Sequence, residues 1–170
     1  MCADLLLPLD LFPSEDDNRV RKEIITMPEF SGSFSGRATL QTTIIASDVP
    51  DHQLNLTEIR GLQKSSDEKW NNARLTYWGF ADLVSGSGLQ RGHFVNEHAD
   101  GDRHWGTFEG KVTTAGSETT LEGTWAFSGG TGKFTGITGQ GTYRGRMPSA
   151  NEVEMSWEGR YELAVSARAA

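Results

Sequence analysis

The chain has 170 residues, which at roughly 150 residues per domain corresponds to one domain, and its net charge is −7. An acidic chain whose lysines and arginines are scattered is not expected to bind nucleic acid, because such partners require clustered basic residues. Cys2 is the only cysteine, so an internal disulfide and a cysteine zinc site are excluded.

No apolar run approaches the roughly 20 residues of a transmembrane helix; the longest cover residues 5–7 and 44–46. Asp4 and Pro8 interrupt the N-terminus, which lacks the basic and apolar regions of a signal peptide. We therefore expect a cytoplasmic protein with no membrane partner. Residues 1–30, rich in acidic residues and prolines, are predicted to form an N-terminal arm or lid before a domain at residues 31–170.

After residue 30 the sequence alternates between apolar and polar residues and is punctuated by glycine, which is typical of strands. The predicted strands are 34–47, 52–63, 74–84, 89–98, 103–114, 120–128, 139–147 and 152–165. Short turns at residues 85–88, 100–101 and 116–117 favour antiparallel hairpins. Many glycines fall inside the strands, where they relieve crowding in a closed sheet. The fold class is therefore all-β, a closed eight-stranded antiparallel barrel whose lumen can hold side chains or one small ligand.

The Asp100-Gly101 pair sets a predicted register for one hairpin. A two-residue loop there would place Glu97 opposite His104 and His93 opposite Phe108. The face that carries these four residues is the more apolar one, so we expect it to line the lumen. His93, Glu97 and His104 are therefore the candidate catalytic residues.

Three roles remain open for this trio. A buried imidazole beside a carboxylate shifts the pKa of each group and suits proton transfer. Two histidines and one carboxylate also match the composition of a metal site, although spacing alone supplies no further ligand. The third alternative is a hydrated position at the rim without function. We expect no metal and no cofactor.

Further side chains are candidates for contact with a ligand. They are Tyr77, Glu58, Arg60, Phe108, Trp125, Tyr143 and Trp157. Glu58 and Arg60 would orient a substrate if they face inwards, but they are solvated if Ile59 marks the inner face, which we favour. For Tyr77, Trp125 and Trp157, packing in the core is the simpler role. Trp78 and Phe80 would point outwards, where they could contact another copy of the chain in a homo-oligomer, a dimer or a trimer.

A glycine-rich stretch covers residues 129–139, Gly-Gly-Thr-Gly-Lys-Phe-Thr-Gly-Ile-Thr-Gly. It is not a phosphate-binding loop, because Phe134 follows Lys133 where serine or threonine is required, and no long helix is predicted after it. We predict a structural connection between two strands.

Together with residues 123–127 and 140–143, this stretch resembles the allene oxide cyclase-like barrel superfamily, which includes plant allene oxide cyclases, dirigent proteins and spirotetronate cyclases. Residues 99–102, 106–111 and 157–161 look like segments of uncharacterised bacterial barrels of this type. The resemblance implies a barrel that holds a hydrophobic small molecule and steers its reaction without a cofactor. The expected function is thus an isomerase, cyclase or lyase. A non-catalytic carrier and, less favoured, a cupin-type metal enzyme remain alternatives.

Overall fold

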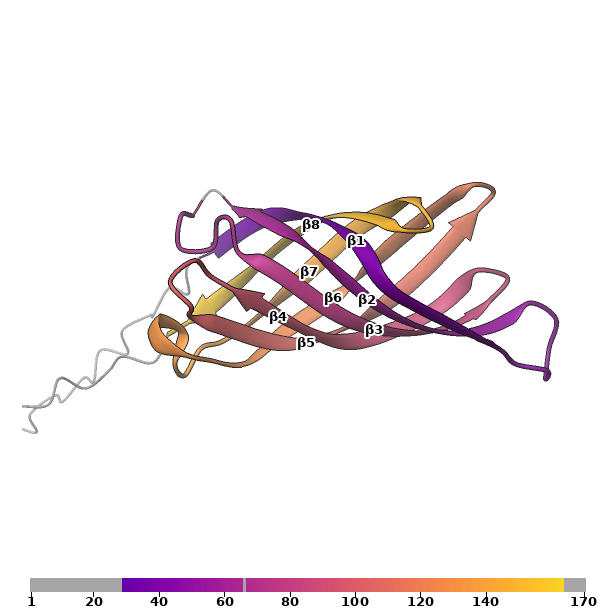
Figure 1. Ribbon diagram of the computed structural model, residues 1–170, viewed down its shortest axis with the longest axis horizontal. Coiled ribbons are helices and arrows are strands. Elements are labelled where there is room, and N and C mark those ends of the chain that lie inside the picture. Colours follow the sequence, from indigo (N-terminus) through magenta and orange to yellow (C-terminus); the bar gives the residue numbers. More distant parts are fainter. Residues whose placement is uncertain (1–28, 66, 164–170) are drawn as a thin grey trace, which may run out of the picture.

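The computed structural model describes residues 29–65 and 67–163, which form an all-β structure (Figure 1). Within this part the strands are β1 (Glu29–Ile45), β2 (His52–Ser65), β3 (Arg74–Val84), β4 (Ser87–Glu97), β5 (Arg103–Ala115), β6 (Glu118–Gly130), β7 (Thr138–Ser149) and β8 (Glu152–Glu162). A short 3₁₀ helix, η1 (Gly132–Phe134), lies between β6 and β7. Residues 1–28 of the predicted arm lie outside the described residues, and β1 already begins at Glu29.

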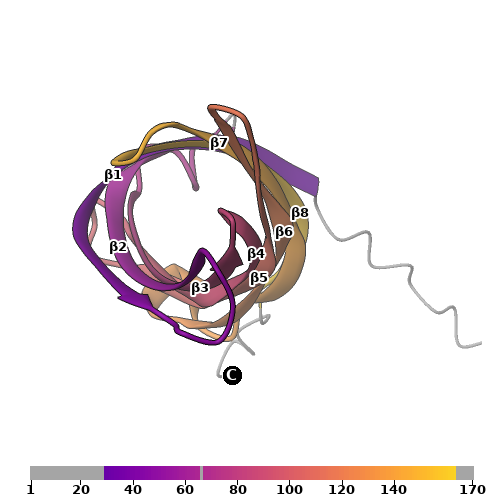
Figure 2. The same cartoon turned by 90° about the vertical axis from the view of Figure 1, so that its right-hand side faces the viewer.

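The eight strands close into a barrel, as predicted. Each strand is antiparallel to its two neighbours, and the order in the sheet follows the order in the chain. β1 completes the ring by pairing with β2 along one edge and with β8 along the other, where Phe30 lies opposite Gly159. Figure 2 shows the strands as a ring around the lumen. Closure gives each of these described strands a neighbour on both sides.

Connections alternate between the two ends of the barrel. The β1–β2, β3–β4, β5–β6 and β7–β8 hairpins lie at one end, on the right in Figure 1, which we call the hairpin end. The β2–β3, β4–β5 and β6–β7 connections lie at the opposite end, which we call the loop end. The start of β1 and the finish of β8 also lie at the loop end.

The β4–β5 turn differs from the prediction. Its loop has three residues, 99–101, and the backbone N–H of His98 donates to the carbonyl of Asp102 across its base (2.9 Å). Gly101 is left-handed, with φ at 86°, and its N–H donates to the carbonyl of His98 (3.0 Å). The predicted two-residue turn would need a left-handed Asp100 as well, which is not observed. The sequence Asp-Gly serves here as the end of a longer loop.

This longer loop shifts the pairing of β4 with β5 by one residue. Glu97 lies opposite Arg103, and Asn96 lies opposite His104. Because side chains alternate between the faces of a strand, a one-residue shift exchanges the two faces of β4. The predicted inward positions of His93 and Glu97 are therefore wrong. The face predicted for β5, which includes His104, is correct.

Aromatic side chains fill the loop end of the lumen. Trp70, from the β2–β3 connection, is fully buried. Its ring centroid lies 4.6 Å from that of Phe30, and it stacks on Phe127 at 5.6 Å with an interplanar angle of 8°. Tyr161 contacts the same ring at 4.8 Å. These rings, brought from four parts of the chain, close this end of the barrel.

Some glycines of the inner face are required because a side chain would collide with a neighbouring strand. A Cβ atom on Gly92 would meet the carbonyl oxygen of Trp78 and would lie 2.7 Å from the ring of Phe108. Gly79, which lies opposite Gly92 in β3, has more room, since its nearest neighbours would be Thr57 Oγ1 at 3.3 Å and Phe108 at 3.5 Å. Of these two paired glycines, Gly79 can therefore be replaced by a residue with a Cβ atom, whereas Gly92 cannot without a collision.

Gly92→Ala is expected to lower the free energy of unfolding by about 1–3 kcal/mol, the usual cost of forcing atoms into a filled interior. Gly79→Ala is the matched control and should be neutral or slightly stabilising, because alanine restricts the unfolded chain. Urea unfolding of both variants measures the difference. An equal loss in both variants would contradict this packing.

Candidate functional site

The lumen contains a cavity of about 90 Å³. This is about three times the ~30 Å³ that one water occupies in the liquid. All eight strands contribute to its lining, which consists mainly of aromatic rings and aliphatic side chains. Amide and imidazole side chains interrupt this lining at four positions, Gln63, Gln90, Asn96 and His104.

The cavity is electrically neutral. None of the described residues that line it is an aspartate, glutamate, lysine or arginine. Burial raises the pKa of Tyr77, and it raises the pKa of Tyr143 to about 12, so both hydroxyls stay protonated. Burial lowers the pKa of His104 to about 3, so its imidazole is neutral. A ligand in this cavity therefore meets dipoles and rings but no full charge.

The predicted catalytic residues do not come together. His104 lines the cavity, whereas His93 is exposed on the outer wall and Glu97 also faces outwards. The Glu97 carboxylate accepts a hydrogen bond from Arg74 (Nη2 to Oε1, 2.6 Å) and lies 3.9 Å from Arg103. The outward positions of His93 and Glu97 also separate them from His104, with which they could have formed a metal site. Across residues 29–65 and 67–163, no cluster of three or more histidine, cysteine, aspartate or glutamate side chains could hold a metal ion.

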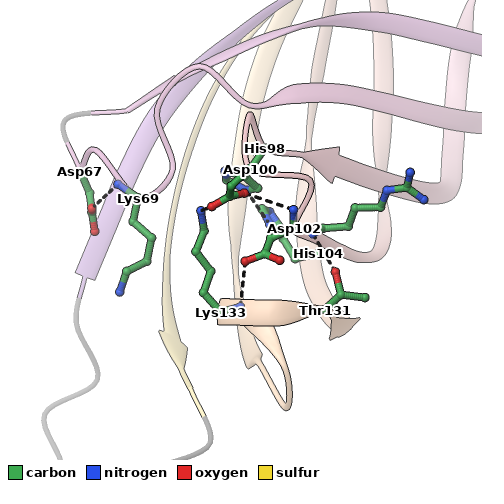
Figure 3. A network of polar contacts seen from close by, with 9 residues as sticks. Asp67, Lys69, His98, Asp100, Asp102, His104, Thr131 and Lys133 are labelled. Atoms are coloured by element: carbon green, nitrogen blue, oxygen red, sulfur yellow. Dashed lines mark hydrogen bonds and ion pairs between the residues drawn. The ribbon is translucent and has the colours of Figure 1, made fainter.

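His104 lies near His98 at the loop end (Figure 3), where it forms part of an aromatic floor of the cavity. Its Nδ1 atom lies 3.2 Å from Nε2 of His98, and its ring packs at 4.8 Å against Trp70 and at 4.7 Å against Phe134. The low pKa of His104 comes first from burial, and the neighbouring His98 and Lys133 lower it further. Burial also lowers the pKa of His98. The two imidazoles form a buried neutral pair.

Polar contacts anchor the β4–β5 loop beneath this pair. Lys133 Nζ donates to Asp100 Oδ2 (2.6 Å), and the backbone N–H of Lys133 donates to Asp102 Oδ2 (2.9 Å) (Figure 3). Gly132 is left-handed, and a Cβ atom there would collide with the carboxylate of Asp102. The glycine-rich stretch connects β6 to β7, as predicted, and it also holds the β4–β5 loop in place.

Trp70 reaches the cavity through a tight turn in the β2–β3 connection. The Asp67 carboxylate accepts the backbone N–H of Lys69 (3.0 Å), and the Asp67 carbonyl accepts the backbone N–H of Trp70 (3.0 Å). The side chain of Gln63 donates to the carbonyl of Trp70 (3.3 Å). These bonds fix the indole inside the barrel.

Most of the predicted ligand-contacting residues line the cavity. They are Tyr77, Phe108, Trp125, Tyr143 and Trp157. Glu58 and Arg60 do not, because Ile59 faces inwards, as in the favoured alternative. On the outer wall, the Glu58 carboxylate accepts hydrogen bonds from Thr39 Oγ1 (2.6 Å) and Trp78 Nε1 (2.7 Å), which hold its pKa below the usual range.

Asn96, Trp70, Gln63 and Gln90 were not identified from the sequence. Asn96 and Gln90 lie on the inner face of β4 with Phe94, so the three-residue loop would have revealed them. Gln63 lies four residues after Ile59 in β2 and so on the same face of the strand. Once Ile59 is taken as inward-facing, the alternation of side chains is enough to predict that Gln63 faces the lumen. Trp70 lies in an irregular connection, where no periodic pattern indicates which way a side chain points.

The outer wall carries the other large features. Trp78 and Phe80 point outwards as expected and are 40% and 37% exposed. Leu56 lies opposite Phe80 and is also exposed. These residues and His93 border an open groove of about 1680 Å³ that is lined mostly by outward-facing side chains.

Histidine–carboxylate contacts in the described chain occur at His52. Its Nδ1 atom lies 2.6 Å from Asp48 and its Nε2 atom 2.8 Å from Asp82, and both hydrogen bonds raise the pKa of His52. His52 begins β2 at the hairpin end and does not line the cavity. His104, the only described histidine that lines the cavity, therefore has no carboxylate partner.

No protein-family model matches the chain, and a search of curated proteins also finds no match. Among the residues that the structure describes, no helix is long and apolar enough to span a membrane.

The buried His104 predicts a pH dependence of stability. An unfolded histidine titrates near pH 6.5, whereas folded His104 titrates near 3, so between these values the unfolded chain binds one more proton. This part of the stability is complete above pH 6.5 and is lost as the pH falls, by up to about 1.4 kcal/mol per pH unit. His104→Phe should flatten the curve between pH 4 and 6 in urea unfolding. Parallel curves for the two proteins would contradict the assignment.

Proposed function

We propose that the barrel binds an uncharged, largely apolar small molecule in its lumen. The observation that carries this proposal is the neutral, aromatic-lined cavity. Burial of apolar ligand surface against such walls is favourable, at roughly 25 cal/mol per Å². A charged ligand would lose its hydration without gaining a counter-charge, which is strongly unfavourable.

The cavity favours a small ligand. Typical ligand pockets enclose about 300–1,000 Å³, whereas this one has about 90 Å³. That is enough for a five-membered ring or for the head of a longer molecule. The hydrophobic ligand expected from the family resemblance would fit only as such a head group unless the lumen widens.

Binding without catalysis is the best supported of the three functions considered. A catalytic barrel of the expected kind would pair a lumenal imidazole with a carboxylate, but among the described residues the imidazole of His104 has a hydrogen-bonding contact with His98 alone. A pKa of about 3 makes His104 a weak base near neutral pH. The cupin-type alternative depended on a trio that does not meet.

A cofactor-independent isomerase, cyclase or lyase is the second candidate, because the uncharged imidazole of His104 lines the cavity and can accept a proton. Loss of product formation in His104→Phe with ligand binding retained would favour it over a carrier. The exposed Trp78 and Phe80 support the further proposal of a homo-oligomer, either a dimer or a trimer.

Thiophene, a flat uncharged five-membered ring, is a suitable probe of lumenal binding. Leu121 lines the cavity and is 5% exposed, so Leu121→Phe should fill part of it and weaken thiophene binding by about 10-fold or more. Leu89→Phe is the matched control on the outer wall, where Leu89 is 65% exposed, and should leave the affinity unchanged. Ligand-observed NMR titration measures the three affinities.

Equal thiophene affinity in both variants would place the ligand outside the lumen. Absence of thiophene binding to the wild-type protein, together with tight binding of a charged probe such as benzoate, would contradict the neutral cavity as the binding site.

A further inference from the structure

The second half of β1 is paired on one side only. β8 pairs with β1 as far as Arg37, and the β7–β8 turn lies just beyond, where the side chain of Gln41 donates to the carbonyl of Ala150 (2.8 Å). β2 continues beside β1 as far as Ile45. The β1–β2 hairpin accordingly projects beyond the β7–β8 hairpin in Figure 1. Residues 40–45 therefore have no described strand on their β8 side.

The backbone of this segment turns hydrogen-bonding groups away from the barrel. The N–H of Ala46 donates to the carbonyl of His52 in β2 (3.0 Å). Because the N–H and C=O groups of successive residues point to opposite sides of a strand, those of Gln41, Thr43 and Ile45 point away from β2. We call residues 40–45 the β1 edge. A row of unpaired N–H and C=O groups is a template on which another strand can pair.

The side chains of the β1 edge do not protect it from such pairing. Natural edge strands are blunted by charges, by proline or by a very short length. The β1 edge has the sequence Leu-Gln-Thr-Thr-Ile-Ile, without a charge or a proline, and its register with β2 is regular. All six residues are exposed. Threonine and isoleucine also favour the strand conformation.

The hairpin that carries the β1 edge is held in shape by its neighbours. His52 Nδ1 lies 2.6 Å from Asp48 in the β1–β2 turn, and His52 Nε2 lies 2.8 Å from Asp82 in β3. The backbone N–H of Ser85 donates to the carbonyl of Asp51 (3.0 Å), which ties the β1–β2 turn to the β3–β4 turn. The β1 edge is therefore preformed, and little conformational entropy is lost when a strand binds to it.

A second copy of the same edge is complementary to it. Two antiparallel strands related by a two-fold axis offer each other the same donors and acceptors. With Thr43 on the axis, Gln41 of each copy lies opposite Ile45 of the other, so all the outward backbone groups of these three residues find partners. On the outer face, Ile44 lies opposite Thr42 of the other copy. No like charges meet across this contact, and its side chains include β-branched residues that pair well between strands.

We propose that the β1 edges of two copies pair antiparallel about a two-fold axis and join two barrels into a dimer through one continuous sheet. A contact of this kind uses the edge of each copy once, so assembly stops at the dimer. This inference rests on the proposed homo-oligomer, of which it names the size and the contact, and it does not depend on the lumenal ligand. The contact is separate from the outer-wall residues Trp78 and Phe80.

Sedimentation velocity of the full chain over a range of concentrations measures the dissociation constant of the dimer. Ile44→Lys places two like charges beside the axis and should raise this constant by about 10-fold or more. Leu89→Lys is the matched control, because Leu89 and Ile44 are similarly exposed (65% and 61%) and Leu89 lies on β4, away from the β1 edge. It should leave the constant unchanged.

Two further measurements address the backbone directly. Thr43→Pro removes an N–H that points away from β2, a position where an edge strand tolerates proline, and should also weaken the dimer. Hydrogen exchange should show the N–H groups of Gln41, Thr43 and Ile45 protected in the dimer and exchanging freely in the monomer.

A dimer that survives both Ile44→Lys and Thr43→Pro would overturn this inference. If Trp78→Ser dissociated it instead, the proposed homo-oligomer would stand with a different contact. Assembly beyond the dimer, or protection of the three N–H groups in a monomer by another part of the chain, would also overturn the inference. A wild-type protein that stays monomeric at every concentration would overturn the inference and the homo-oligomer together, but not lumenal binding, which the thiophene titration tests separately.

Discussion

The pairing of β1 with β8 is the contact on which the remaining structure depends. It turns eight antiparallel strands into a ring, so that alternate side chains are enclosed in one lumen and the others face outwards. Glycines such as Gly92 stand where a side chain would collide with a neighbouring strand. Enclosure also fixes which polar groups are removed from water. The strand residues that line the cavity follow from this division into two faces.

Within the lumen, the two ends are built differently. The loop end is filled by Trp70, Phe134 and the His98–His104 pair, which are anchored by the contacts of Lys133 with the β4–β5 loop. The cavity lies against this aromatic floor and contains dipoles without charges. Such a site suits recognition of a neutral molecule by shape and a few directed hydrogen bonds. It is less suited to acid–base chemistry for two reasons. Burial lowers the pKa of His104 to about 3 and keeps its imidazole neutral, and no carboxylate of the described residues lines the cavity beside it.

Residue periodicity was sufficient to predict the barrel, but not the composition of its site. The alternation of β8 and the glycines within strands indicated the strands and their closure, and the Val112–Leu121 pairing correctly gave the inner faces of β5 and β6. The inner face of β4 depended on one loop. Asp-Gly can form a two-residue turn or finish a three-residue loop, so the sequence of the turn does not decide which side chains of β4 face inwards. The two-residue turn that we predicted places Asn96 on the outer face. Trp70 could not be predicted because its orientation comes from a turn centred on Asp67.

The most direct test of this account is a crystal structure of the purified protein that resolves the contents of the lumen. The account predicts one uncharged molecule packed against the aromatic rings that line the cavity. A lumen filled completely by its own side chains, with no space left between the rings, would contradict it. So would an ionised molecule held in the same cavity.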